Sequence, residues 1–313
     1  MATLASRFHF ASAPDSWGVL DYPGPSWNQS YEKMLDEMVA AGYTGSELGP
    51  YGFFPTDPAV LKPQLDKRQL KLLGSFVPVV LSDPASAAIA VEQIRKVGHL
   101  LAELKAPFLV LADAQSEERN RISGRVPNDD SAALTAAQWM NVAKVVEQAA
   151  KVASEFGLDL VFHPHVATYV ETPKECERFF DVTSHTGVGL CLDTGHCVYG
   201  GGDSIAEADK FRSVLRFVHI KDVDANVLKY ARSRKLNFEQ AIEEKVFTII
   251  GQGSIDFPAF FRLLAKNNYN GWMVVEQDVK FGATPVPPAE SIAASLKYLR
   301  GVIKDLSTAA VAK

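Results

Sequence analysis

Eight short apolar runs, each followed by a segment of helical periodicity, limit the fold of this chain more than any other feature. A continuous apolar strand followed by a crossover helix is typical of a parallel sheet that is buried on both faces. Eight such units in 313 residues predict a (β/α)8 TIM barrel. The expected strands lie at residues 8–14, 43–49, 71–81, 107–113, 158–165, 188–194, 216–222 and 272–278.

Two of the expected helices show the pattern clearly. In residues 30–42, Met34 and Met38 share one face and Gly42 supplies a C-terminal stop. A longer helix is expected over residues 135–157. The alternative fold, an open doubly wound sheet, is disfavoured because no GxGxxG follows the first strand and because the strand count matches barrel closure.

The chain lacks a linker rich in Pro, Gly and Ser, so we expect residues 1–313 to form a single barrel domain. Two polar stretches, at about residues 114–131 and 223–255, each follow an expected strand and are interpreted as loop insertions. In a barrel, the loops after the strands form the face that carries the chemistry.

Composition narrows the range of partners. The formal net charge is -5 and Lys/Arg runs do not exceed a pair, which argues against nucleic acid and favours a small-molecule substrate. The sequence shows neither a signal peptide nor an apolar window long enough for a membrane span, and three cysteines without CxxC spacing fit a reducing compartment. We therefore expect a soluble, cytoplasmic protein, and a homo-oligomer is left open.

Several strands end in side chains that commonly bind metals. Since side chains two residues apart share a face of a strand, alternation decides which of them point into the same space. Carboxylates combined with imidazoles suit Mn²⁺, Co²⁺, Fe²⁺, Zn²⁺ or Mg²⁺, and the lack of thiolates argues against a closed structural zinc site. The pattern predicts an open catalytic metal site, and Cys191 is expected to be a packed core residue. The strand-end residues are His163 and His165, Asp193 and His196, His219, Lys221 and Asp222, and Glu276 and Asp278.

Seven motifs in order resemble one known family over nearly the whole chain. They are ASAPDSWGV (11–19), GYTGSELGPYGFFP (42–55), FHPHVATYVET (162–172), LCLDTGH (190–196), VHIKDV (218–223), GQGSIDF (251–257) and NGWMVVEQD (270–278). In these motifs the chain resembles the xylose isomerase-like TIM barrels of sugar isomerases, epimerases and dehydratases, and within them the inosose dehydratase branch.

The resemblance implies a metal site held by Asp193, His219 and Glu276. The fourth family ligand, commonly a glutamate, falls at His163, with Glu171 as a less favoured substitute. Mn²⁺ and Co²⁺ are the preferred metals for such a site.

The resemblance also implies an activity, that of a metal-dependent hydro-lyase in inositol catabolism. The expected reaction dehydrates a cyclic keto-polyol, such as 2-keto-myo-inositol, by removal of the proton beside the ketone and loss of the next hydroxyl. His163, His165 or Glu276 could serve as the base, and Lys221 could hold a substrate oxygen.

Four further residues are expected to contact the substrate. Glu47 could accept a hydrogen bond from a sugar hydroxyl or orient a metal ligand. Asp15 and Trp17 follow the first strand, and Trp17 could form an apolar wall. His196 lies beyond a strand tip, so we expect it to support the site without binding the metal. The loop of residues 251–257 contains no lysine or arginine, which favours a non-phosphorylated substrate.

Other functions remain as alternatives. A ketose isomerase or epimerase would use the same metal, but His163 at the position of the family's glutamate favours elimination. A lyase that performs β-elimination on 3-keto-glycosides is a related option. A DNA-repair nuclease is disfavoured by the negative charge, and a sugar-binding barrel without activity is disfavoured by the retained ligands.

Overall fold

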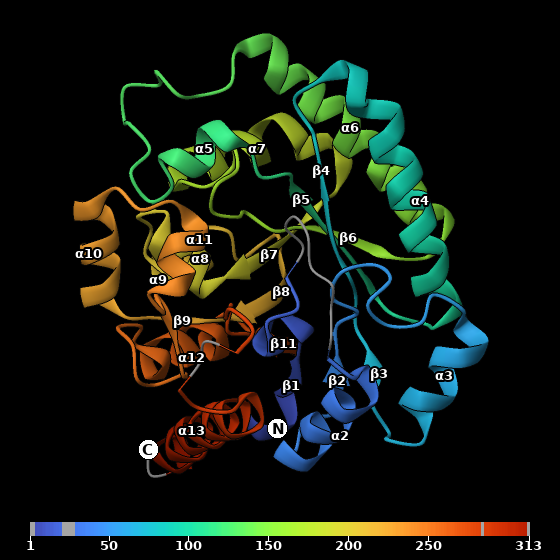
Figure 1. Cartoon of the computed structure of the whole chain (residues 1–313), viewed down its shortest axis with the longest axis vertical. Helices are drawn as coiled ribbons and strands as arrows, with labels where there is room; N and C mark the ends of the chain where they lie inside the picture. The colour runs from blue at the N-terminus through green and yellow to red at the C-terminus, as the bar shows by residue number, and fades with distance from the viewer. Residues whose placement is uncertain (1–3, 21–28, 283–284, 312–313) are drawn as a thin grey trace.

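The computed structural model of the chain describes residues 4–20, 29–282 and 285–311, and a parallel sheet that curls on itself lies at its centre (Figure 1). The strands lie side by side in the order β3-β2-β1-β11-β8-β7-β6-β5-β4, and helices surround them. This arrangement confirms the predicted (β/α)8 barrel. The strands are β1 (Phe8–Ser12), β2 (Gly45–Ser46), β3 (Lys71–Leu72), β4 (Phe76–Val79), β5 (Phe108–Asp113), β6 (Asp159–Phe162), β7 (Gly189–Asp193), β8 (Leu215–Ile220) and β11 (Gly271–Val275).

The two ends of the strand order, β3 and β4, are parts of the single strand expected over residues 71–81. Leu73 joins them: its N–H donates to Ser46 O on β2, and its carbonyl accepts from Phe108 N on β5, both at 3.0 Å. The barrel therefore closes through this segment. A Cβ atom on Gly74 would lie 2.9 Å from Phe108 O, so the close approach of the two strands requires glycine.

The helices of the outer layer begin and end at residues that suit helix termini. In α2, Met34 and Met38 are buried and Gly42 ends the helix with a φ of 97°, as predicted. Among the described residues, none of the helices is both long and apolar enough to cross a membrane. The helices are α1 (Leu4–Arg7), α2 (Tyr31–Ala41), α3 (Pro58–Asp66), α4 (Ala87–Glu103), α5 (Glu117–Arg121), α6 (Ala136–Glu155), α7 (Pro173–Thr183), α8 (Thr194–Tyr199), α9 (Ser204–Lys210), α10 (Ala225–Arg234), α11 (Phe238–Glu243), α12 (Phe257–Lys266) and α13 (Pro288–Val311).

Two apolar layers stabilise the barrel. One lies between the sheet and the helices, and the other fills the barrel interior with residues that include Val161, Cys191, Phe217 and Val274. Cys191 is fully buried, which confirms its predicted packing role. The interior is therefore filled by side chains, and the space for a ligand lies at its mouth.

The two stretches interpreted as polar loop insertions contain regular structure. Residues 114–131 include α5, and residues 223–255 include α10, α11 and β10 (Phe247–Thr248), which pairs antiparallel with β9 (Asp222–Val223). Apolar side chains spaced among the charged ones form a small separate core there, with Tyr199, Phe238 and Phe247 at its centre. Both stretches follow the carboxyl ends of strands. That the whole chain is a single domain stays a prediction.

Candidate active site

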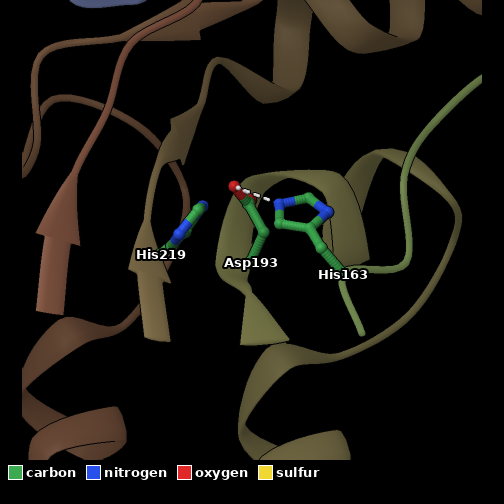
Figure 2. Close-up of side chains that lie close together, drawn as sticks. All are labelled: His163, Asp193 and His219. Carbon is green, nitrogen blue, oxygen red and sulfur yellow. Dashed lines mark ion pairs between the residues drawn. The ribbon is translucent and has the colours of Figure 1, made fainter. Parts of the chain in front are cut away.

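The carboxyl ends of five barrel strands bring possible metal ligands together. His163 follows β6, Asp193 ends β7 and His219 lies near the end of β8. Glu47 follows β2 and Glu276 follows β11. Figure 2 shows His163 and Asp193 pointing toward each other with His219 beside them.

These five side chains form two overlapping sets that share His219. His163, Asp193 and His219 form one set, and Glu47, His219 and Glu276 form the other; within each set the donor atoms lie within 4.8 Å of one another. His219 Nε2 lies 3.2 Å from Glu47 Oε1, and His219 Nδ1 lies 3.1 Å from Glu276 Oε2. Glu47 was not predicted as a ligand; in the strand expected over residues 43–49 it was expected to bind a sugar hydroxyl or to orient a ligand.

The donor set suits a divalent cation. Ligand atoms that each lie about 2.1 Å from one ion are about 3.0 Å apart in octahedral and about 3.4 Å apart in tetrahedral geometry, and His163 Nε2 lies 3.5 Å from Asp193 Oδ2. Asp193 Oδ2 is buried and accepts no hydrogen bond from the described residues; Lys221 Nζ lies 3.4 Å away, so the oxygen keeps lone pairs free for a bound cation. Burial lowers the pKa of His163 to about 4, which keeps its imidazole neutral and able to ligate.

Lys221 places a buried ammonium group among the carboxylates. Its Nζ lies 2.8 Å from Asp278 Oδ1, 3.1 Å from Glu276 Oε2 and 3.4 Å from Asp193 Oδ2. Burial disfavours its charge, but these three carboxylates together hold the pKa of Lys221 well above its usual value. Lys221 is therefore charged, so it can bind a substrate oxygen but cannot act as a base.

Val166 determines where two neighbouring histidines carry their protons. His165 Nδ1 lies 2.7 Å from Val166 O, and since a carbonyl only accepts, this nitrogen is protonated. Val166 N donates to His196 Nδ1 at 3.3 Å, so a neutral His196 carries its proton on Nε2. The ring centroids are 3.9 Å apart. His165 therefore offers a free Nε2 lone pair, whereas His196 Nε2 lies 3.5 Å from Asp278 Oδ2 and 3.4 Å from Lys221 Nζ.

Asp15 supplies a carboxyl group whose pKa is raised, unlike those of Asp193, Glu276 and Asp278. Burial, followed by the negative charge of Glu276, raises the pKa of Asp15 well above its usual value. Asp15 lies on the wall of the same cavity, and its Oδ2 is 3.7 Å from Lys221 Nζ. A protonated carboxyl group is a hydrogen-bond donor and a source of protons.

These groups surround a cavity of about 80 Å³ at the mouth of the barrel. Most of the predicted site residues lie on its wall, and Asp193 lies directly beside it. Phe76 was not predicted: its ring lies 5.5 Å from the ring of His163 and 5.4 Å from that of His165. An apolar residue inside an apolar strand gives no signal that would have identified it. Further unpredicted wall residues are Val19, Leu20, Gly49, Pro50 and Gln115.

The barrel and its cluster can now be compared with known proteins. Residues 35–302 match the family described as xylose isomerase-like TIM barrel. The chain belongs to this family. The resemblance seen in the seven motifs is thereby confirmed.

Relatives within the family include proteins with assigned names. The chain is 30% identical over 279 residues to inosose dehydratase of Geobacillus kaustophilus (strain HTA426), which covers 89% of this chain and 90% of the relative. It is 36% identical over 265 residues to the rhizopine catabolism protein MocC of Rhizobium meliloti, with 85% and 80% covered. Among solved structures, the IolI protein with a binding zinc atom has a TM-score of 0.68 at 16% identity and covers 95% of this chain and 98% of its own.

Two residues that the sequence suggested for the site, Trp17 and Glu171, do not lie in the cluster of possible metal ligands. Trp17 is packed in the core between sheet and helices, and its Nε1 donates to Glu37 Oε2 at 2.7 Å. We therefore correct its expected role from a substrate wall to a packing residue. Both carboxylate oxygens of Glu171 accept backbone N–H groups, from Gly124 and Ala167, so Glu171 organises loops and is not placed as a fourth ligand.

The backbone N–H groups of the GQGSIDF loop, residues 251–257, donate hydrogen bonds to the side chain of Asp222. Asp222 Oδ2 accepts hydrogen bonds from Gly251 N and Gly253 N, both at 2.9 Å, and Oδ1 accepts from Ile255 N at 3.2 Å. Backbone N–H groups that could hold a phosphate are thus used internally. This supports the expectation of a non-phosphorylated substrate. Asp256 in the same loop caps α12, since its side chain accepts a hydrogen bond from Ala259 N.

Proposed function

We propose that this protein is a hydro-lyase that dehydrates a cyclic keto-polyol such as 2-keto-myo-inositol. The observation that carries the proposal is the pairing, on one cavity beside the ligand cluster, of His165, which presents a proton acceptor, with Asp15, whose raised pKa makes it a proton donor. Relatives named inosose dehydratase, at about 30% identity over most of the chain, support this hydro-lyase class.

His163, Asp193, His219 and Glu276 are the residues that would hold a divalent metal, with Glu47 close by. When bound, the metal would stabilise the negative charge that develops on the ketone oxygen as the neighbouring carbon loses its proton. Mn²⁺ or Co²⁺ is our proposal for this ion. The zinc atom of IolI is a property of that protein, and it supports a divalent ion in general.

We assign the proton transfers to two residues of the chain. His165 Nε2 takes the proton from the carbon beside the ketone, because its Nδ1 is already bonded to Val166 O. The C–O bond at the next carbon then breaks, and Asp15 gives its proton to the departing hydroxyl, which leaves as water. A carbon–carbon double bond forms between the two atoms. Lys221 binds a substrate oxygen and orients the ring.

The proposal is tested by metal content and by product absorbance. Purified protein is analysed for bound metal and is then incubated with 2-keto-myo-inositol while the ultraviolet absorbance of the conjugated product is recorded. Asp193→Ala and His219→Ala should lose both the metal and the absorbance change. His99→Ala, which removes an exposed histidine of α4, should keep both. If the two ligand variants retain full metal content, the proposed site is wrong.

A further inference from the structure

Two segments that follow different strands meet above the histidine pair. α5 lies in the loop after β5, and α11 lies in the insertion after β8. Asn120 Oδ1 accepts a hydrogen bond from Phe238 N at 2.8 Å, and Asn120 Nδ2 donates to Glu239 Oε2 at 2.7 Å. The Asn120 side chain therefore binds the first turn of α11, where backbone N–H groups have no partner within the helix.

Phe238, whose backbone N–H is bonded to Asn120, also contacts the histidine pair with its side chain. Its side chain is fully buried, and its ring centroid lies 5.6 Å from the rings of both His165 and His196. Phe247 lies 5.5 Å from the ring of His196 in the same small core. The two aromatic rings cover the histidine pair on the side of the insertion and exclude water there.

A second contact ties the loop after β5 to the segment that carries the histidines. Glu171 accepts hydrogen bonds from Gly124 N at 2.6 Å and from Ala167 N at 2.8 Å. Gly124 belongs to the loop after β5, and Ala167 follows His165 by two residues. The loop is thus bonded at one point to the histidine segment and at another to the helix of Phe238.

We propose that Asn120 is a positioning residue that holds Phe238 against His165 and His196, so that the loop after β5 and the insertion after β8 form one roof over the site. Asn120 is not part of the cavity wall, so it acts through Phe238. The catalytic consequence rests on the proposed dehydration, whereas the geometry of the roof does not. With the roof in place, the His165 ring keeps the orientation that directs Nε2 at the substrate.

The test compares Asn120→Ala with Asn226→Ala, which changes an exposed asparagine of the same insertion. Hydrogen exchange of the α11 amides, ring nitrogen NMR signals of the histidines, and kcat and KM with 2-keto-myo-inositol are measured. In Asn120→Ala we expect amide exchange to be about tenfold faster and kcat to fall about tenfold with little change in KM. The His165 and His196 ring signals should shift, while Asn226→Ala matches the unmodified protein in all respects.

Two further variants separate positioning from loss of structure. The double variant Asn120→Asp with Glu239→Gln keeps the oxygen that accepts from Phe238 N and lets the new amide donate to the new carboxylate, so it should show slow exchange even if Asn120→Ala does not fold. Glu239→Ala removes only the second contact and should leave the Phe238 amide protected.

Two outcomes overturn the proposal: unchanged exchange in Asn120→Ala, or faster exchange with unchanged kcat and unchanged histidine signals. If the unmodified protein does not dehydrate the substrate, the proposed function fails. The exchange and ring nitrogen measurements then still decide whether the roof exists.

Discussion

At the scale of single residues, Lys221 sets the charge balance of the site. Its ammonium group is the cation placed between the ligand cluster and the outer carboxylates, with Nζ 3.7 Å or less from four of them. Burying several carboxylates is tolerable only if cations compensate them. Three of these groups are carboxylates that need compensation, Asp193, Glu276 and Asp278, whereas the fourth, Asp15, has a raised pKa and holds a proton.

We expect Lys221→Met to lower the free energy of unfolding of metal-stripped protein by about 3–5 kcal/mol, because the buried carboxylates lose their partner. Urea unfolding in the presence of a chelator measures this change. Lys62→Met removes an exposed lysine of α3 and should stay within about 0.5 kcal/mol of the unmodified protein. Equal unfolding midpoints for the two variants would show that Lys221 is not the compensating charge.

The sequence placed some residues of the site correctly for a simple physical reason. Strand ends that converge in a barrel bring Asp193, His219 and Glu276 together, and the family resemblance singled these three out among the strand-end candidates. Trp17 lies in a 3₁₀ turn after β1, where side-chain direction does not follow strand alternation. Phe238 reaches the site only through contacts between two insertions, which no local pattern encodes.

At the scale of elements, the segment after β6 is held by buried carboxylates. Glu171 accepts from Ala167 N, and Asp113 accepts from Tyr169 N at 3.1 Å. Burial raises the pKa of Glu171 to about 7 and that of Asp113 to about 6. Both groups therefore hold protons in the folded state at pH values where the unfolded chain, with carboxyl pKa values of about 4, has released them.

This difference predicts the sign of a pH effect. Because Glu171 and Asp113 bind more protons in the folded state between about pH 4 and pH 7, their contribution to the free energy of unfolding should fall as pH rises through this range. Glu171→Gln should flatten the dependence by roughly 2 kcal/mol between pH 5 and pH 8, measured by urea unfolding at each pH. Glu177→Gln, on the exposed side of α7, is the control and should keep the original slope. A slope that Glu171→Gln leaves intact would rule Glu171 out as its source.

The closing strand gives a second prediction at this scale. A Cβ atom on Gly74 would approach Phe108 O to 2.9 Å, whereas one on Gly301 in α13 would meet no atom within 4 Å. Gly74→Ala should lower the free energy of unfolding by about 1–3 kcal/mol, while Gly301→Ala should raise it by up to about 1 kcal/mol. Thermal and urea unfolding of the pair measure this contrast, and a stable Gly74→Ala protein would contradict the tight closure.

At the scale of the whole molecule, the barrel could be predicted from the sequence, but the small core of the insertion at its mouth could not. Eight apolar strands with crossover helices leave few ways to bury both faces of a parallel sheet. The insertion of residues 223–255 looks polar because its apolar side chains, such as Leu228 and Phe247, are spaced among charges. Their small core also includes Val166 and Ala167, which follow β6, and Tyr199 of α8, so its existence depends on contacts between distant parts of the chain.

The ligand cluster should link metal binding to the stability of the whole barrel. Adding Mn²⁺ to chelator-stripped protein at about 100 times its dissociation constant should add about 2.7 kcal/mol of stability and raise the melting temperature by several degrees. Differential scanning calorimetry measures the shift. Asp193→Asn should show little or no shift, and a shift equal to that of the unmodified protein would place the metal elsewhere.

Proton NMR of 2-keto-myo-inositol in D₂O with metal-loaded protein tests the proposed dehydration most directly. We predict that one hydroxyl-bearing carbon loses its oxygen as water and that the signals of a dehydrated, conjugated ring product replace those of the substrate. Recovery of a substrate that carries deuterium beside the ketone, or that has an inverted centre or a displaced carbonyl, without loss of water would contradict the dehydratase and indicate an isomerase or epimerase.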